Sequence, residues 1–368
     1  MAVYKLFPTQ DATLYSIDPE MNTGLDEIIE ASLTVGALET PAPQASRFLI
    51  QFSSEEIDDI INNKISSSAW QSNLRCFIAD VTALNAATTL EIYPVSQSWN
   101  MGTGKYLNVP ETQNGASWIW RNYQGGTIWT TSSFAANSTG SYSSSVSPGG
   151  GTWYTNYSSS QQFDCYSDKD INVDVTDITS AWYSASVPND GFIVKQQTEF
   201  IDDEDVQPKI KYFSIDTHTI YPPCLEFRWD DYIFDTGSSA NTILGVSPFV
   251  VTIGDNLGYF YLESINKFRV YSRPEYPART FSTSSYFTQN YYLPTASYYA
   301  IKDLNTNEYV VDFDSTYTKL SLDTTSSYFN LYMNGLQPER YYKILIKTTV
   351  NGNTVVMDND YYFKIING

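Results

Sequence analysis

Histidine and cysteine are scarce in this chain of 368 residues. It contains one histidine, His218, and three widely separated cysteines, Cys76, Cys165 and Cys224. One imidazole cannot form a zinc-binding cluster, and no Gly-x-Ser-x-Gly motif is present to mark a serine hydrolase. Three distant cysteines predict neither a disulfide framework nor a zinc site, so we interpret them as reduced thiols. These absences predict a protein that is not an enzyme and uses no metal or cofactor.

Basic residues are also few. The 21 Lys and Arg stand against 41 Asp and Glu, which gives a formal net charge of −20. This charge argues against nucleic acid or an anionic membrane as a partner, because both would be repelled. No stretch approaches the roughly 18 apolar residues of a membrane span, and the residues after Met1 lack the apolar core of a signal peptide. We therefore expect a protein that is made in a cytoplasm and does not use the general secretion route.

Two further motifs partly resemble known functional sites, a phosphate-binding loop and a pair of catalytic carboxylates. Gly102-Thr103-Gly104-Lys105 lacks the spacing of a Walker phosphate loop and no helix pattern follows it, so it predicts a turn. Asp202-Asp203-Glu204-Asp205 is too contiguous to position the separate acid and base of a glycosidase. We interpret this run as a solvated loop, with a weak calcium site as the alternative.

Aromatic residues are abundant, with 30 Tyr, 19 Phe and 8 Trp. This composition favours pleated, half-buried strands. Period-two alternation recurs along the chain, most clearly at 171–175, and predicts many short strands. Ser53 and Glu56 form a capping box that predicts one short helix near residues 54–64. The sequence therefore predicts an all-β fold with one short helix.

The pattern divides the chain into two β-sandwich domains. We place the first at 1–229, a turn-rich linker at 230–241 and the second domain at 242–368. In the second domain, Asn351-Gly352 predicts a tight turn between strands at 341–347 and 361–366.

Residues 97–162 interrupt the first domain with a Gly- and Ser-rich insertion that shows no clear period. An insertion of this length is usually functional or disordered, and its aromatic content argues against disorder. Its tryptophans allow three interpretations: they cap the sandwich's own core, anchor a protein interface, or stack on sugar rings. The candidate binding residues are the five tryptophans of this segment, Trp99, Trp118, Trp120, Trp129 and Trp153.

Several motifs follow the order found in DNRLRE-type β-sandwich domains. The early ones are Asp11-Ala12-Thr13, Asn22-Thr23-Gly24, Leu33-Thr34-Val35-Gly36 and Arg47-Phe48. The later ones are Val173-Asp174-Val175-Thr176, Ala181-Trp182, Asn189-Asp190-Gly191-Phe192 and Pro222-Pro223-Cys224-Leu225. Residues 1–229 thus resemble such a domain, and the resemblance implies a jelly-roll sandwich.

The second domain resembles an immunoglobulin or fibronectin-III-like module. Gly335-Leu336-Gln337-Pro338 followed by Tyr342 is similar to the Gly-Leu-x-Pro-x-x-x-Tyr corner that precedes a late strand in such modules. The whole chain resembles virion proteins of T4-like bacteriophages, especially those of marine cyanobacteria. The segments on which this resemblance rests are residues 22–28 and 271–281.

These resemblances imply a location in a virion that is assembled in the host cytoplasm. We expect a non-enzymatic structural component of the neck, tail or fibre base that docks other virion proteins and forms a homo-oligomer within a symmetric assembly. The alternative is a carbohydrate-binding adhesin that recognises a glycan of the host surface.

Overall fold

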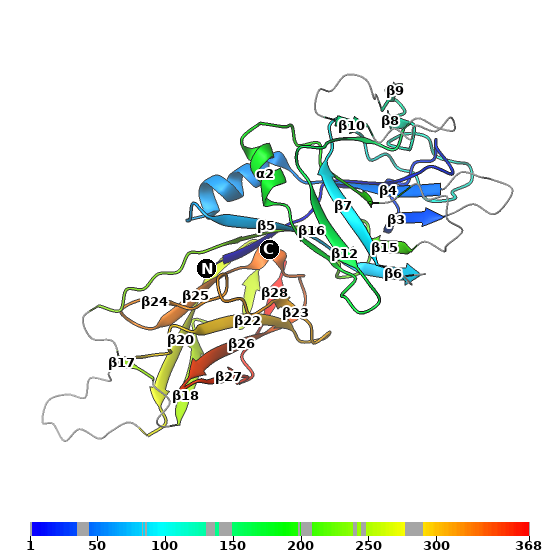
Figure 1. Cartoon of the computed structure of the whole chain (residues 1–368). Coiled ribbons are helices and arrows are strands. Elements are labelled where there is room, and N and C mark those ends of the chain that lie inside the picture. Colours follow the sequence, from blue (N-terminus) through cyan, green and yellow to red (C-terminus); the bar gives the residue numbers. More distant parts are fainter. Residues whose placement is uncertain are drawn as a thin grey trace, which may run out of the picture. The chain divides into compact units, whose positions relative to one another are not determined.

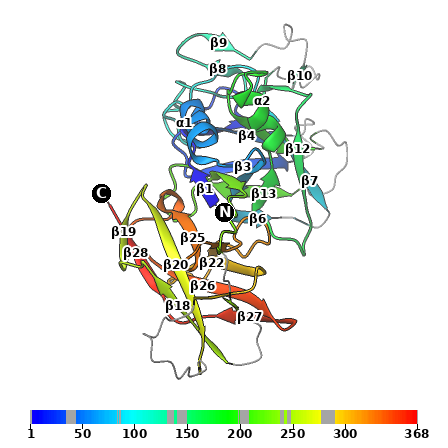
Figure 2. The same cartoon turned by 90° about the vertical axis from the view of Figure 1, so that its left-hand side faces the viewer.

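The structure is a computed structural model of the chain (Figures 1 and 2). It describes residues 2–34, 44–82, 84, 87–129, 137–139, 149–197, 199, 208–237, 241–243, 248–276 and 290–367. Strands dominate these residues, which confirms the all-β prediction. The chain divides into an N-terminal unit, Leu6–Asn62 with Gln71–Glu226, and a C-terminal unit, Met1–Lys5 with Asn63–Trp70 and Phe227–Gly368.

The described residues of the segment predicted as a linker, 230–241, belong to the C-terminal unit. Phe234 forms a parallel β-bridge with Leu322. The backbone N–H of Asp235 donates to the Leu322 carbonyl at 3.0 Å, and the Leu322 N–H donates to the Ile233 carbonyl at 2.8 Å. Residues 233–235 therefore lie at an edge of the C-terminal sandwich. The Asp- and Gly-containing composition of the segment 230–241 is equally typical of a linker, so composition alone does not distinguish the two.

Eight strands form the main sheet of the N-terminal unit (Figure 1). They are β2 (Gln10–Tyr15), β3 (Ile28–Thr34), β4 (Gln44–Gln51), β6 (Ile78–Thr82), β7 (Thr88–Pro94), β12 (Ser159–Phe163), β14 (Phe192–Gln196) and β15 (Lys209–Phe213). Their order is β12-β7-β14-β4-β3-β15-β6, with β2 paired to β4, and neighbouring strands are antiparallel. The side chains from Ala45 to Ile50 of β4 and all five side chains of β14 are buried. Because side chains alternate between faces, both faces of this sheet are covered at its centre.

A second sheet has the order β1-β16-β5-β13. Its strands are β1 (Ala2–Leu6), β5 (Trp70–Cys76), β13 (Ile171–Asp174) and β16 (Cys224–Trp229). In β13 the side chains of Ile171 and Val173 are buried and those of Asn172 and Asp174 are exposed, as the alternating sequence predicts. Short strands of the insertion form two small ladders: β8 (Trp120–Asn122) with β9 (Thr127–Ile128), and β10 (Asn137–Thr139) with β11 (Thr152–Tyr154).

The predicted short helix near residues 54–64 is confirmed, with Ser53 as its N-cap. Helix α1 (Ser54–Asp59) begins after Ser53, whose side chain accepts the Glu56 N–H, and it continues as a π-helical turn, η1 (Ile60–Lys64). Ile57 and Ile60 are its buried side chains. A second helix, α2 (Thr176–Tyr183), was not predicted, and it lies beside α1 (Figures 1 and 2). The two helices supply the walls of the pocket described below.

The C-terminal unit is a sandwich of two six-stranded sheets (Figure 2). Phe268 and Phe329 of one sheet share a buried core with Tyr299, Ile344 and Phe363 of the other. The first sheet contains β17 (Asn241–Thr242), β18 (Phe249–Gly254), β20 (Ile265–Pro274), β21 (Tyr291–Tyr292), β24 (Ser321–Leu322) and β25 (Ser327–Tyr332). The second contains β19 (Tyr259–Tyr261), β22 (Ser297–Asp303), β23 (Tyr309–Val311), β26 (Tyr341–Val350), β27 (Asn353–Met357) and β28 (Tyr362–Ile366).

The tyrosine corner predicted before β26 is present. A short 3₁₀ turn, η2 (Met333–Gly335), leads into it. The Gln337 N–H donates to Tyr342 Oη at 2.7 Å, and the same hydroxyl donates back to the Gln337 carbonyl at 3.2 Å. The Tyr342 ring is buried in the core of the sandwich. This local geometry fits the resemblance to immunoglobulin-like modules.

The Asn351-Gly352 turn is present, but its return strand differs from the prediction. Asn351 and Gly352 both have positive φ, which is the conformation of a tight hairpin turn. They join β26 to β27, with Val350 opposite Asn353. The later strand β28 pairs with the beginning of β26, where Tyr342 lies opposite Phe363. Since β22 occupies one edge of β26, β27 and β28 share the other edge.

Candidate functional site

Four of the five candidate tryptophans lie inside the N-terminal unit. Trp99, Trp118, Trp129 and Trp153 are 0–7% exposed. They pack with apolar side chains of the main sheet, namely Ala12, Leu14, Leu33, Ala45, Leu49 and Ile193. Trp120 is half-buried and its ring contacts that of Tyr123 at a centroid distance of 5.2 Å. The four buried rings fit the core interpretation of the insertion, because they cover the second face of the sheet as an additional layer.

A buried arginine holds this layer on the sheet. Arg47 Nε donates to Glu199 Oε1 at 2.8 Å, and its Nη2 donates to Oε2 at 2.6 Å. Its Nη1 donates to the Gly150 carbonyl at 2.5 Å. The guanidinium carbon lies 4.8 Å from the Trp118 ring centroid and 5.3 Å from that of Trp153. We call these five residues the Arg47 clamp; it combines a bidentate ion pair with cation–π contacts at a buried position.

The Gly102-Thr103-Gly104 segment packs around a buried asparagine, as the turn interpretation expects. Asn22 Nδ2 donates to the carbonyls of Met101 and Ala116, both at 2.8 Å. The Gly104 N–H donates to Asn22 Oδ1 at 2.7 Å. A Cβ atom on Gly104 would lie 2.0 Å from the Asn22 carbonyl oxygen, so only glycine fits there. The backbone N–H of Gly104 is thus already used inside the protein.

The remaining candidates for chemistry are dispersed. His218 is 89% exposed and its Nε2 lies 3.7 Å from Glu27 Oε1. Cys76 and Cys224 are buried, Cys165 is exposed, and none of the three forms a disulfide. Among the residues that the structure describes, no group of three or more His, Cys, Asp and Glu is placed to hold a metal ion. The acidic run 202–205 lies outside the described residues.

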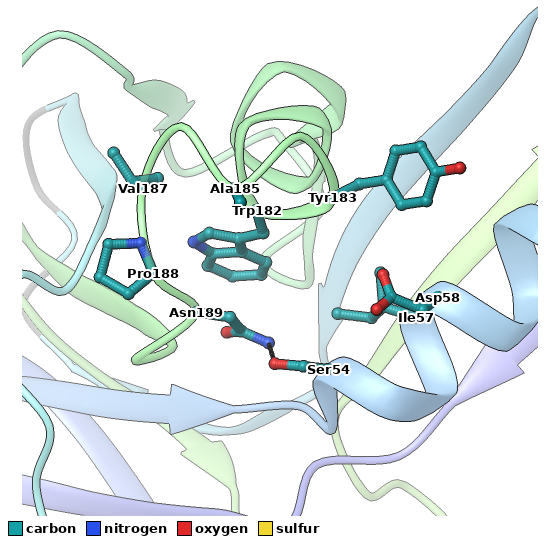
Figure 3. A pocket seen from close by; sticks show the side chains of 9 residues that line it. All are labelled: Ser54, Ile57, Asp58, Trp182, Tyr183, Ala185, Val187, Pro188 and Asn189. Carbon is teal, nitrogen blue, oxygen red and sulfur yellow. Dashed lines mark hydrogen bonds between the residues drawn. The ribbon is translucent and has the colours of Figure 1, made fainter.

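A pocket of about 380 Å³ opens between α1, α2 and the loop that follows α2 (Figure 3). The Trp182 ring lies at its centre, with Val187 and Pro188 on one side (Figure 3). Ile57 and Asp58 approach from α1 on the other side. The remaining lining residues are Ser54, Tyr183, Ala185 and Asn189. An aromatic floor therefore meets a polar rim.

Hydrogen bonds fix the polar rim of the pocket. Asn189 Nδ2 donates to the Phe52 carbonyl at 3.0 Å and to Ser54 Oγ at 3.1 Å. This leaves the Ser54 hydroxyl hydrogen able to donate to a ligand. Tyr183 Oη donates to Asn62 Oδ1 at 2.7 Å, and Asp58 offers an exposed carboxylate. Such a site suits a small ligand that has an apolar face and several hydroxyl groups.

Sequence reasoning did not identify this pocket. The motifs Ala181-Trp182 and Asn189-Asp190-Gly191-Phe192 marked a family resemblance and not a binding site. The pocket combines residues 54–58 with residues 182–189, and no spacing rule joins segments so far apart. Trp182 lines this pocket and lies outside the Trp-rich insertion at 97–162.

A second candidate surface covers the outer face of the sheet that contains β26. Strand pairing places Tyr259 and Tyr341 on either side of Lys364, and Tyr362 opposite Lys343. The intervening residues Phe260 and Phe363 point into the core. The face carries five tyrosines that are 43–57% exposed, Tyr259, Tyr261, Tyr309, Tyr341 and Tyr362, with four lysines, Lys302, Lys343, Lys347 and Lys364. We call this set the tyrosine–lysine face.

The lysines of this face lie against aromatic rings. Lys302 Nζ is 5.1 Å from the Tyr309 ring centroid, and Lys347 Nζ is 4.6 Å from that of Phe313. Lys343 instead pairs with two aspartates of the neighbouring loop, Asp358 at 2.8 Å and Asp360 at 2.9 Å, and Lys364 pairs with Glu339. The face is thus a broad aromatic surface on which two of the four lysines are neutralised by acidic side chains.

Comparisons with known proteins add little to this description. No family model and no curated protein matches the chain. A crystal structure of a DUF4785 family protein from Legionella pneumophila is similar at 9% sequence identity, covering 84% of this chain and 67% of that one. Its TM-score of 0.16 carries no argument about fold or function. In the described part of the chain, no helix has the length and apolarity needed to cross a membrane.

Proposed function

We propose that this chain is a non-enzymatic structural component of a bacteriophage particle, of the neck, tail or fibre base, and that it docks other particle proteins. The observation that supports this proposal best is the tyrosine–lysine face. The solvent side of a largely antiparallel sheet is ordinarily polar, whereas this one carries five exposed tyrosines. Tyrosine is enriched at protein interfaces, and broad exposed apolar surfaces mark sites of association.

In this proposal the docking surface lies on the C-terminal sandwich and not on the Trp-rich insertion. The Trp-rich insertion supplied the candidate binding residues, but most of its rings are used inside the N-terminal unit. The exposed aromatic groups instead lie on the C-terminal sandwich. The resemblance to virion proteins of T4-like bacteriophages supports a particle as the place of assembly.

Replacing Tyr261 and Tyr362 together by serine should remove the chain from particles. Each ring is more than half exposed, so the fold should tolerate its loss. A tyrosine at the centre of an interface commonly contributes about 2 kcal/mol, so the double variant should reduce incorporation by at least about tenfold. The measurement is copy number by quantitative mass spectrometry of purified particles, in a strain that carries the variant as its only copy.

The matched control is Tyr166→Ser, at a tyrosine that is 94% exposed in the N-terminal unit. It should leave copy number unchanged. Wild-type incorporation of the double variant, with its circular dichroism spectrum unaltered, would contradict the proposal.

The α1–α2 pocket favours a second candidate function, a carbohydrate-binding adhesin. A pyranose ring has an apolar face that fits an aromatic side chain such as Trp182, and its hydroxyl groups fit Asp58 and Ser54. The volume of about 380 Å³ lies within the range of small-ligand sites. In this function the pocket would recognise a glycan of the host surface.

Asp58→Ala and Tyr183→Ala should each weaken sugar binding by about tenfold if this candidate is right, because each removes one wall or one polar contact. Both side chains are exposed, which makes them safer changes than Trp182. The measurement is saturation-transfer NMR and titration calorimetry against a panel of monosaccharides and short oligosaccharides. Tyr166→Ala serves as the control outside the pocket. No binding by the wild-type chain to any member of the panel would remove this candidate.

A further inference from the structure

Helix α1 places two polar side chains in the wall of the α1–α2 pocket (Figure 3). Ser54 and Asp58 lie four positions apart on the helix, so they occupy the same side of it, one turn from each other. Both side chains are exposed, whereas Ile57 beside them is buried. A ligand in the pocket therefore meets two polar groups whose separation is set by the helix.

The two groups differ in the hydrogen bonds that they can make with a ligand. Ser54 Oγ already accepts a hydrogen bond from Asn189 Nδ2 at 3.1 Å, so its own hydroxyl hydrogen is left to donate. The carboxylate of Asp58 has two oxygens that accept and no hydrogen to donate. A well-matched ligand thus offers an acceptor to Ser54 and a donor to Asp58, about one helical turn apart.

The charge of Asp58 is not balanced by the walls of the pocket. Asp58 is the only charged residue among the nine that line it. None of the residues three or four positions away on the helix, where an ion-pair partner would lie, is basic. The polar side of the pocket is therefore negative, and the opposite side is formed by Trp182, Val187 and Pro188.

We infer that the ligand of this pocket is an amino sugar, a hexose unit with a free protonated amine beside a hydroxyl group. The inference rests on the second function proposed above, because it names the class of sugar that the same pocket would bind. The ammonium group donates to Asp58, the neighbouring hydroxyl oxygen accepts from Ser54, and the apolar face of the ring packs against Trp182. Hydrogen bonds between two charged groups are stronger than those between neutral groups, so the amine adds to the contacts of an ordinary hexose.

Other classes of ligand satisfy fewer of these groups. A neutral sugar can donate to Asp58 through a hydroxyl group but leaves its charge unbalanced. An acidic sugar places a second negative charge beside Asp58, which is unfavourable. A lysine or arginine side chain balances the charge, but it carries no acceptor for the Ser54 hydroxyl. The amino sugar provides both the cation and the acceptor.

Titration calorimetry on the purified full-length chain tests the inference with four monosaccharides: 2-amino-2-deoxyglucose, its N-acetyl form, glucose and glucuronate. At about pH 6 the free amine is protonated. We expect the amino sugar to bind about fivefold more tightly than glucose or the N-acetyl form, and glucuronate to bind most weakly. The preference is modest because Asp58 is exposed, and it should decrease as salt rises.

Substitutions on α1 separate the charge from the other contacts. The quantity to compare is the ratio of the Kd for glucose to the Kd for the amino sugar. Asp58→Asn should lower this ratio to about one, because the asparagine retains an acceptor but has no charge. Glu55→Gln removes the same charge from an exposed residue of the helix that does not line the pocket, so it should retain the ratio. Ser54→Ala should weaken both sugars and also retain the ratio. Circular dichroism checks that each variant is folded.

Three results would overturn the inference: equal affinity for glucose and the amino sugar, a preference that survives Asp58→Asn, or tighter binding of a lysine-containing peptide than of the amino sugar. Equal affinity for the two sugars leaves the carbohydrate-binding function in place and removes only the choice of an amino sugar. If none of the four sugars, and no member of the wider panel, binds to the wild-type chain, the carbohydrate-binding function is removed together with the inference.

Discussion

Replacing Arg47 by alanine should lower the free energy of unfolding of the N-terminal unit by about 3–5 kcal/mol. Arg47 and Glu199 are 1% and 3% exposed, so removal of the cation leaves a buried carboxylate without its partner. The Gly150 carbonyl also loses its donor, and Trp118 and Trp153 lose the cation between them. The additional layer over the sheet depends on these contacts, so it should loosen first.

Chemical denaturation followed by tryptophan fluorescence measures this effect, because clamp residues Trp118 and Trp153 report on the layer. Arg121→Ala is the matched control: this arginine lies in the same insertion and donates to the Ser98 carbonyl at the surface. It should cost less than about 1 kcal/mol. Arg47→Met combined with Glu199→Leu should recover much of the loss, because it removes both buried charges together. Equal stability of Arg47→Ala and the wild type would show that the clamp does not hold the layer.

A buried carboxyl should make the same unit less stable as pH rises. Asp11 on β2 is fully buried, and its Oδ2 accepts the Ile215 N–H at 2.7 Å. Its Oδ1 has no hydrogen-bond partner among the described residues. Burial, with smaller contributions from the charges of Asp216 and Asp26, raises the pKa of Asp11 from 3.8 to about 8.

The direction of this pH dependence follows from the number of protons that the folded and unfolded states bind. Between pH 3.8 and about 8 the folded state keeps the Asp11 proton and the unfolded state has lost it. The free energy of unfolding therefore falls as pH rises, by up to about 1.4 kcal/mol per pH unit, and levels off once Asp11 ionises in both states. Asp11→Asn retains an acceptor for the Ile215 N–H and cannot ionise, so it should flatten the profile and stabilise the protein near pH 8.

Urea denaturation at a series of pH values checks this prediction. Asp58→Asn, at an exposed carboxylate of the same unit, is the control and should leave the profile close to that of the wild type. If Asp11→Asn and the wild type show the same pH slope, Asp11 ionises normally and the prediction is wrong.

Features that depend on neighbouring residues were predictable from the sequence. The N-cap at Ser53 and the tyrosine corner at Tyr342 each involve partners within five positions, so their residue types indicate their geometry. Helix α2 gave no comparable indication. Its N-cap residue is Val175, which makes no side-chain cap, and the turn is instead stabilised by Asp174 accepting the Thr176 N–H.

The tryptophans and Arg47 show where prediction from sequence stopped. Five tryptophans in a Gly- and Ser-rich segment fit a core layer and an interface equally well, because composition does not indicate which surface covers them. The partners of Arg47 are 103 and 152 positions away along the chain. Only the folded sheet brings Glu199 and Gly150 to the same side chain, so the clamp could not be predicted from local spacing.

The segment between Val95 and Trp153, which contains most of the insertion, begins and ends at one place in the fold. Val95 and Trp153 form an antiparallel bridge, and the Ser96 N–H donates to the Thr152 carbonyl at 3.0 Å. The entropy needed to close a loop grows only with the logarithm of its length, so chain added between two paired positions costs the scaffold little. Evolution can therefore lengthen or shorten this segment as a block while the strand order of the sheet stays the same. The buried tryptophans then determine how much of the added chain becomes an ordered layer.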